Sequence, residues 1–155
     1  MTIKTIAYFA GSVILAVCFV FATLSLVSRK QSAAGLQAGR LHQCPDSPNC
    51  VSSEHPHPTA YIEPFRFEIS AGQAMQRIRQ VIVAQGGQVM TVRDEYIHAI
   101  FVSKLFRFID DVEIRLDADS RQLHVRSASR VGHSDLGMNR QRIERLRTAF
   151  HAAQS

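Results

Sequence analysis

The chain of 155 residues contains no tryptophan and lacks the motifs that identify several large protein classes. There is no Gly-x-Ser-x-Gly elbow, no phosphate-binding loop and no zinc-protease motif, so the common signatures of hydrolases, nucleotide-binding enzymes and metalloproteases are missing. RNA-binding signatures and a zinc-finger pattern are missing too, so the net charge of +5 does not indicate a nucleic-acid partner. The length fits one domain with an appendage.

Charge is absent from Thr5 to Ser28, where Ile, Val, Leu and Phe dominate. At about 1.5 Å per residue, a helix over this run exceeds the roughly 30 Å hydrocarbon thickness of a bilayer. A signal peptide usually has a shorter apolar region that ends at a small-residue cleavage site. Residues 32–34 (Ser-Ala-Ala) have that composition, but two basic residues precede them. We therefore predict an uncleaved single-pass membrane anchor over residues 1–30, followed by a small, polar tether over residues 31–40.

Cysteine is scarce, and two of the three cysteines, Cys44 and Cys50, lie in a Pro-rich turn where a disulfide would close a short loop. Three nearby histidines, His42, His55 and His57, invite a zinc site as the alternative. Zinc-binding cysteines are commonly two to four residues apart, whereas five residues separate this pair. The sequence therefore favours the disulfide, and we predict neither a metal nor a cofactor.

The side of the membrane on which the domain lies is indicated by two conflicting signals. Arg29, Lys30 and Arg40 follow the apolar run and only Lys4 precedes it, which by the positive-inside rule leans towards a cytoplasmic domain. A disulfide, however, persists only in an oxidising compartment. We predict a protein of the inner (cell) membrane with a periplasmic C-terminal domain.

The region from residue 41 to 155 is predicted to form a single α+β domain with an irregular, Pro- and Cys-containing N-terminal wrap. Apolar residues alternate from Phe65 to Ile69, as in a half-buried strand. Ser70 is a plausible N-cap for a helix that buries one apolar stripe and ends at Gly86-Gly87. The stripe comprises Ala74, Met75, Ile78, Val81 and Ile82. A last helix begins near Asn139 and buries Ile143, Leu146 and Phe150.

Four further strands are predicted between the two helices, at Gln88–Arg93, Tyr96–Ser103, Arg107–Asp117 and Gln122–Arg130. Short turns make consecutive strands antiparallel. The order is β-α-β-β-β-β-α, with both helices on one face of an antiparallel sheet.

Charged residues in two of these strands are expected to face each other. A two-residue turn at Asp119-Ser120 would place Glu113 opposite Arg126, with Asp111 diagonal to Arg130. Together with Asp110, these carboxylates form a structural ion-pair cluster or, alternatively, part of a functional site, because ion-pair networks and functional sites look alike in a sequence.

Three motifs resemble a known family. They are Asn49-Cys50-Val51-Ser52-Ser53, then Phe108-Ile109-Asp110-Asp111-Val112-Glu113, and then Arg126-Ser127-Ala128-Ser129-Arg130-Val131-Gly132 with Ser134-Asp135-Leu136-Gly137 and Asn139-Arg140. In this order they resemble the domain-of-unknown-function family numbered 1499. The resemblance implies an envelope-type protein, often exported or membrane-attached, and implies no activity. His133 departs from the pattern, because an aromatic residue such as Tyr is common there.

The segment after the last strand is the candidate ligand site. Arg140 and Arg142 fall where a helix begins, an end that favours negative charge, so an anion is expected nearby. Guanidinium groups and the free amides of a helix start are a common way to hold one. We expect Arg130 and Arg140 to converge on a single anionic or amphiphilic ligand, such as an anionic lipid or a small anion. The predicted ligand-binding residues are Arg126, Ser127, Ser129, Arg130, His133, Asp135, Asn139 and Arg140.

Two other functions remain open. In a hydrolase-like enzyme, Asp110, Asp111 or Glu113 with His133 would supply acid–base groups, and Ser127, Ser129 or Ser134 a nucleophile. Asp110 and Asp111 are adjacent on a strand and point to opposite faces, so they cannot form a carboxylate pair without a bulge. We predict no catalytic residue. A protein-interaction module of the cell envelope is the third possibility, and an exposed apolar patch would distinguish it.

Overall fold

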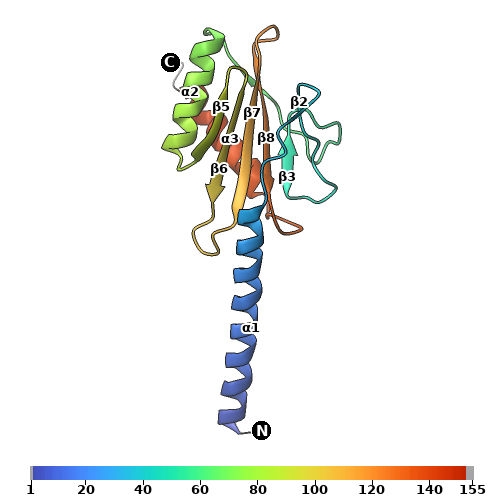
Figure 1. The fold of residues 1–155 in the computed structure, drawn as a ribbon, viewed down its shortest axis with the longest axis vertical. Coiled ribbons are helices and arrows are strands. Elements are labelled where there is room, and N and C mark those ends of the chain that lie inside the picture. Colours follow the sequence, from blue (N-terminus) through green and yellow to red (C-terminus); the bar gives the residue numbers. More distant parts are fainter. Residues whose placement is uncertain (1, 153–155) are drawn as a thin grey trace.

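A computed structural model describes residues 2–152 of the chain. Its elements are α1 (Ile3–Lys30), β1 (Leu36–Gln37), β2 (Arg40–Leu41), β3 (Cys50–Ser52), β4 (Phe65–Arg66), α2 (Ala71–Ala84), β5 (Gln88–Arg93), β6 (Tyr96–Val102), β7 (Ile109–Asp117), β8 (Gln122–Ser129) and α3 (Met138–Ala152). The predicted α+β class with an antiparallel sheet and an N-terminal apolar helix is confirmed. In Figure 1, α1 extends from one end of the domain, while α2 and α3 lie against the sheet.

The sheet has the order β3-β8-β7-β6-β5, and β4 also pairs with β8. All its pairings are antiparallel. The predicted strand order therefore needs one correction: part of the N-terminal wrap joins the sheet as edge strand β3. The expected strand from Phe65 to Ile69 is reduced to the two residues of β4.

The hydrophobic core lies between the sheet and the two C-terminal helices. The predicted stripe of α2 is buried, and Ile143, Leu146 and Phe150 of α3 are fully buried. Ser70 caps α2 as expected, because its side chain accepts from the Gln73 amide while Gln73 reaches back to the Ser70 amide. Alternation along β7 and β8 sends Val112, Ile114, Leu123 and Val125 into this core.

The opposite face of the sheet, which we call the outer face, is covered by the segment predicted as a tether. Residues 36–41 form the two-stranded hairpin β1–β2. The hairpin's second strand contacts β7 and β8. The segment that follows α1 therefore covers the outer face of the sheet.

Candidate functional site

The core face of β8 continues into a buried polar junction with α3. Asn139 is fully buried and accepts hydrogen bonds from the Ser127 hydroxyl at 2.5 Å and from Arg142 at 2.5 Å. Its amide nitrogen donates to the Asn49 carbonyl at 2.9 Å and to the Ser129 hydroxyl at 3.0 Å. Every polar atom of the Asn139 side chain thus has a partner, as burial requires. The junction ties the wrap, the sheet and α3 together.

Arg142 links this junction to β7. Its guanidinium pairs with the Asp110 carboxylate and lies 4.9 Å from the centre of the Phe101 ring. The charge expected to attract a ligand at this position is therefore compensated within the fold.

The outer face carries a second polar group, centred on Glu113, which is fully buried. The register places Glu113 opposite Arg126, and the two side chains lie 2.8 Å apart. The Tyr96 hydroxyl donates to the same carboxylate at 2.7 Å, and the amide of Gly35 donates at 2.7 Å. Burial and the hydrogen bond to Glu113 raise the pKa of Tyr96 above its ordinary value, so this hydroxyl stays protonated and remains a donor.

Asp111 forms the neighbouring ion pair on the outer face. It accepts from His98 at 2.7 Å and from two nitrogens of Arg130, at 2.7 and 2.8 Å. Burial alone would raise the pKa of Asp111, but the hydrogen bonds from His98 and Arg130 outweigh it and hold the pKa below its ordinary value. Asp111 is thus a carboxylate at neutral pH.

Arg130 joins this pair to the end of α1. Its guanidinium donates to the carbonyls of Ser28 and Gln31, where the last turn of a helix leaves carbonyls without helical partners. The Ser28 hydroxyl in turn accepts from the Ile109 amide at 2.8 Å, and Ser28 is fully buried. The arginine therefore acts as a cap that holds α1 on the sheet.

Glu54 organises a third ion-pair group, between the wrap and β7. It pairs with Arg115 at 2.7 Å and with Arg40 at 3.1 Å, and it accepts from the Leu41 amide at 2.7 Å. Burial raises the pKa of Glu54, but hydrogen bonds from Arg115, Leu41 and Arg40 more than offset it and leave the pKa lowered. His124, beside this group, has a pKa lowered chiefly by burial.

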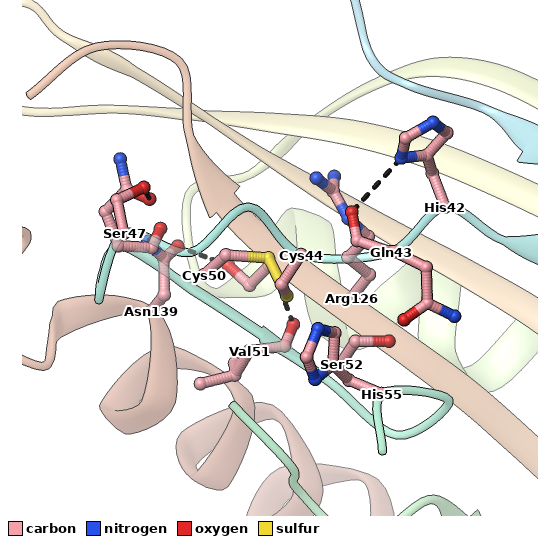
Figure 2. The surroundings of a disulfide bond; sticks show 12 residues. His42, Gln43, Cys44, Ser47, Cys50, Val51, Ser52, His55, Arg126 and Asn139 are labelled. Carbon is pink, nitrogen blue, oxygen red and sulfur yellow. Dashed lines mark hydrogen bonds between the residues drawn. A yellow bond between two sulfur atoms is a disulfide. The ribbon is translucent and has the colours of Figure 1, made fainter. Parts of the chain in front are cut away.

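The two cysteines of the wrap form a disulfide, Cys44–Cys50 (Figure 2), so neither is available as a thiolate ligand for zinc. The nearby histidines have other neighbours. His42 contacts the Gln43 carbonyl at 3.1 Å, His55 accepts from the His57 amide at 3.0 Å, and His57 contacts the Thr59 hydroxyl at 2.8 Å.

A cavity of about 530 Å³ opens beside the disulfide, between the wrap and the start of α3. Its apolar wall includes Pro45, Pro48, Cys50, Val51 and Ala60, and its polar wall includes Asp46, Ser47, His55, His57, Thr59, Asp135 and Arg140. Asp135 caps α3 by accepting from the amides of Gly137 and Asn139. We call this space the disulfide cavity.

Arg140 is the cation of this cavity, and part of its hydrogen-bonding capacity is occupied. One guanidinium nitrogen donates to the carbonyls of Thr59 and Tyr61, at 2.9 and 2.8 Å. Arg147 donates from two nitrogens, one to the carbonyl of Pro64 and the other to that of Glu63. Arg140 and Arg147 of α3 thus hold the wrap through its backbone carbonyls.

The predicted ligand-binding residues do not form one group. Arg126 and Arg130 lie on the outer face, Ser127, Ser129 and Asn139 belong to the core-face junction, and only Asp135 and Arg140 line the disulfide cavity. The expected convergence of Arg130 and Arg140 on one anion is wrong, because Arg130 is turned towards α1. His133 is exposed in the loop after β8. Asp110, Asp111 and Glu113 are each paired with an arginine, which leaves the acid–base hypothesis without a free carboxylate among them.

Several outer-face residues were missed by the sequence analysis, among them Tyr96, His98 and Glu54. A usable signal exists for two of them. Alternation along β6 puts Tyr96 and His98 on one face, and the antiparallel pairing of β6 with β7, which residues 103–108 connect, puts His98 opposite Glu113. Glu54 lies in irregular chain, where no periodic pattern indicates its partner.

Comparison with known proteins returns one match. The family model described as Protein of unknown function (DUF1499) matches residues 40–150. No curated protein and no solved structure matches the chain.

Proposed function

The chain belongs to the DUF1499 family, whose function is not established, and we propose that it is a single-pass membrane protein with an envelope-facing binding domain. The domain lies on the oxidising side of the inner (cell) membrane. It binds a small anionic or amphiphilic ligand in the disulfide cavity and catalyses no reaction.

The membrane anchor is supported by the composition of α1 and by its contacts. The helix has 28 residues and a mean hydropathy of 2.4 over its most apolar window. Its length, about 42 Å, exceeds the hydrocarbon thickness of a bilayer. Its last turn is held by Arg130 and by the Ser28–Ile109 hydrogen bond. Cleavage after residue 34 would strip these buried groups of their partners, which favours a retained anchor over a cleaved signal peptide.

The oxidising side is supported by the Cys44–Cys50 bond. The charge signal opposes this side, because Arg29, Lys30 and Arg40 follow the apolar run. A reporter that is active only outside the cytoplasm, fused after Ser155, should give signal. Activity from a cytoplasmic reporter alone would reverse the orientation.

The ligand site is supported by one observation above others: a cation held in place on the wall of a cavity. The cavity's volume lies within the range of about 300–1,000 Å³ usual for small-molecule sites. The carbonyls of Thr59 and Tyr61 fix the guanidinium of Arg140 at the first turn of α3, whose helix dipole also favours an anion. The apolar wall beside it suits an attached hydrocarbon chain.

Thermal unfolding of the full chain in detergent tests the site. Inorganic phosphate, an alkyl phosphate and a neutral alkyl glycoside are compared. A ligand at one hundred times its Kd stabilises the folded state by about 2.7 kcal/mol, which is roughly 10 °C for a domain of this size. We expect the alkyl phosphate to give such a shift in the wild type and the neutral glycoside to give none.

Two variants of α3 assign the shift to the cavity. Arg140→Gln should abolish it, while the matched control Arg145→Gln should keep it, because Arg145 is exposed and does not line the cavity. If no anion moves the wild-type midpoint, the binding proposal fails and the arginine is only a clamp on the wrap.

A further inference from the structure

The loop between β6 and β7, residues 103–108, packs against the side of α1. The ring of Phe106 stacks on that of Phe21, with centroids 4.2 Å apart and an interplanar angle of 16°. Phe108 lies 6.0 Å from Phe21 and 5.7 Å from Phe106. The contact joins two segments about 85 residues apart in the chain. It packs the loop on the apolar helix rather than on the rest of the domain.

The loop is apolar at its tip, where a water-exposed hairpin loop is usually polar. Leu105 is 79% exposed and Phe106 is 37% exposed. A groove of about 440 Å³ lies between the tip and α1, lined largely by apolar residues that include Cys18, Ala22 and Leu26. Two exposed cations, Lys104 and Arg107, flank the tip. Apolar side chains bordered by Lys and Arg are typical of segments that lie in a membrane interface.

The position of Phe21 along α1 gives the depth of the loop. Phe21 lies about 24 Å beyond Thr5, where the uncharged run begins. A hydrocarbon layer of roughly 30 Å that starts at Thr5 therefore ends about 6 Å beyond Phe21. A ring stacked on Phe21 lies at the same depth, inside the leaflet nearer the domain.

We propose that residues 103–108 form a second membrane contact, in which Leu105 and Phe106 insert among the acyl chains and Lys104 and Arg107 meet the lipid phosphates. This inference rests on the membrane anchor proposed above. A domain fixed at both α1 and the loop cannot turn freely about the end of the helix.

A fixed orientation of the domain also sets the position of the disulfide cavity relative to the membrane. The loop after β8 projects from the same end of the sheet as the β6–β7 loop and α1 (Figure 1). It carries Leu136, which is 88% exposed, next to the cavity residue Asp135. A fixed orientation therefore keeps this end of the domain, with one wall of the cavity, close to the lipid headgroups.

Depth-dependent quenching in vesicles tests the insertion. The full chain is labelled with an environment-sensitive fluorophore at Leu105→Cys, in a Cys18→Ser background with the disulfide intact. It is then reconstituted into phosphatidylcholine–phosphatidylglycerol vesicles, with or without lipids that carry a nitroxide quencher on the acyl chain. The matched control is Val92→Cys on β5, whose side chain is also largely exposed, at 51%. A third label, at Val13→Cys, reports on α1 itself.

We expect blue-shifted emission and strong loss of intensity with shallow acyl-chain quenchers at position 105, and water-like emission without quenching at position 92. Position 13 should be quenched by deep nitroxides. Quenching at 13 with water-like emission at 105 would overturn the loop contact and leave the anchor intact. Blue-shifted emission at 105 without lipid quenching would mean that a protein surface covers the loop, which also overturns the proposal. Absence of quenching at 13 would remove the anchor, and the loop contact with it.

Discussion

Removing the charge of Glu113 should be the most destabilising conservative substitution on the outer face. The fully buried carboxylate receives hydrogen bonds from Arg126, Tyr96 and the Gly35 amide, all between 2.7 and 2.8 Å. In Glu113→Gln the volume is retained, but only one oxygen remains to accept three donors, and Arg126 loses its counter-charge. Breaking a buried ion pair by removing one partner costs about 3–5 kcal/mol.

That loss is a third or more of the stability of many domains. With a shift of about 4 °C per kcal/mol for a domain of this size, the midpoint should fall by roughly 12–20 °C. Tyrosine fluorescence during heating of the full chain in detergent measures it, because the chain has no tryptophan and two of its three tyrosines, Tyr61 and Tyr96, lie in the domain.

Two controls separate the buried pair from a general effect of charge. Glu144→Gln removes an exposed carboxylate that pairs with Arg147 on α3, and it should cost less than about 1 kcal/mol. The double variant Glu113→Gln/Arg126→Met should recover about 2 kcal/mol of the single variant's loss, because it also removes the unpaired cation. The buried Nε of Arg126 already lacks a hydrogen-bond partner, so Arg126→Met removes a side chain whose hydrogen bonds are incomplete. Equal stability of Glu113→Gln and Glu144→Gln would refute this account of the network.

Three further outcomes are expected. The variant Cys44→Ser, in which Cys50 is also changed to Ser, should lose about 2 kcal/mol of stability, measured by urea unfolding, because the closed loop is short. The pKa of Asp111 is lowered in the folded state, so its contribution to the free energy of unfolding is fully present above the unfolded pKa of about 3.9 and is lost as the pH falls below it. In Asp111→Asn the free energy of unfolding should therefore fall less steeply on acidification. An unchanged slope of this free energy between pH 5 and 3 would contradict the assignment. The pKa of His124 is also lowered, so its contribution to the free energy of unfolding is present above the unfolded pKa of about 6.5 and is lost on acidification. His124→Gln should reduce the loss of stability between about pH 6.5 and 5, measured by unfolding at each pH.

The helices and the long strands could be predicted because their signals are local. The spacing of Ala74, Ile78 and Ile82 matches the turn of a helix, and the alternation along β7 and β8 matches a strand. Strand β3 has no such signal. All three of its residues, Cys50–Ser52, are buried, so no alternation is visible, and its conformation follows from pairing with β8.

The cross-strand ion pairs could also be predicted, because register is fixed once a turn is placed. Glu113 and Arg126 follow from the turn after β7 alone. The contact of the segment after α1 with this pair could not be predicted, because Gly35 binds Glu113 through its backbone amide, a group that every non-proline residue carries. The convergence of Arg130 and Arg140 failed for a related reason. Backbone carbonyl acceptors leave no mark in the sequence, and both arginines bind carbonyls, Arg130 at the end of α1 and Arg140 in the wrap.

The two faces of the sheet therefore use different chemistry for different attachments. The face towards α2 and α3 is apolar across its centre, where burial of side chains supplies stability without directional bonds. On the outer face, the end of α1 and the residues after it are held by directional bonds to Arg130, Ile109 and Glu113. An apolar layer of similar volume can be as stable as a buried ion-pair network. Hydrogen bonds are directional, whereas apolar contacts are not, so the network restricts the angle of α1. The helix so held is about 42 Å long, so a small change of this angle displaces its far end by several ångströms. We interpret the outer-face network as the device that sets this angle, and the stacking of Phe106 on Phe21 as the second point that an orientation requires.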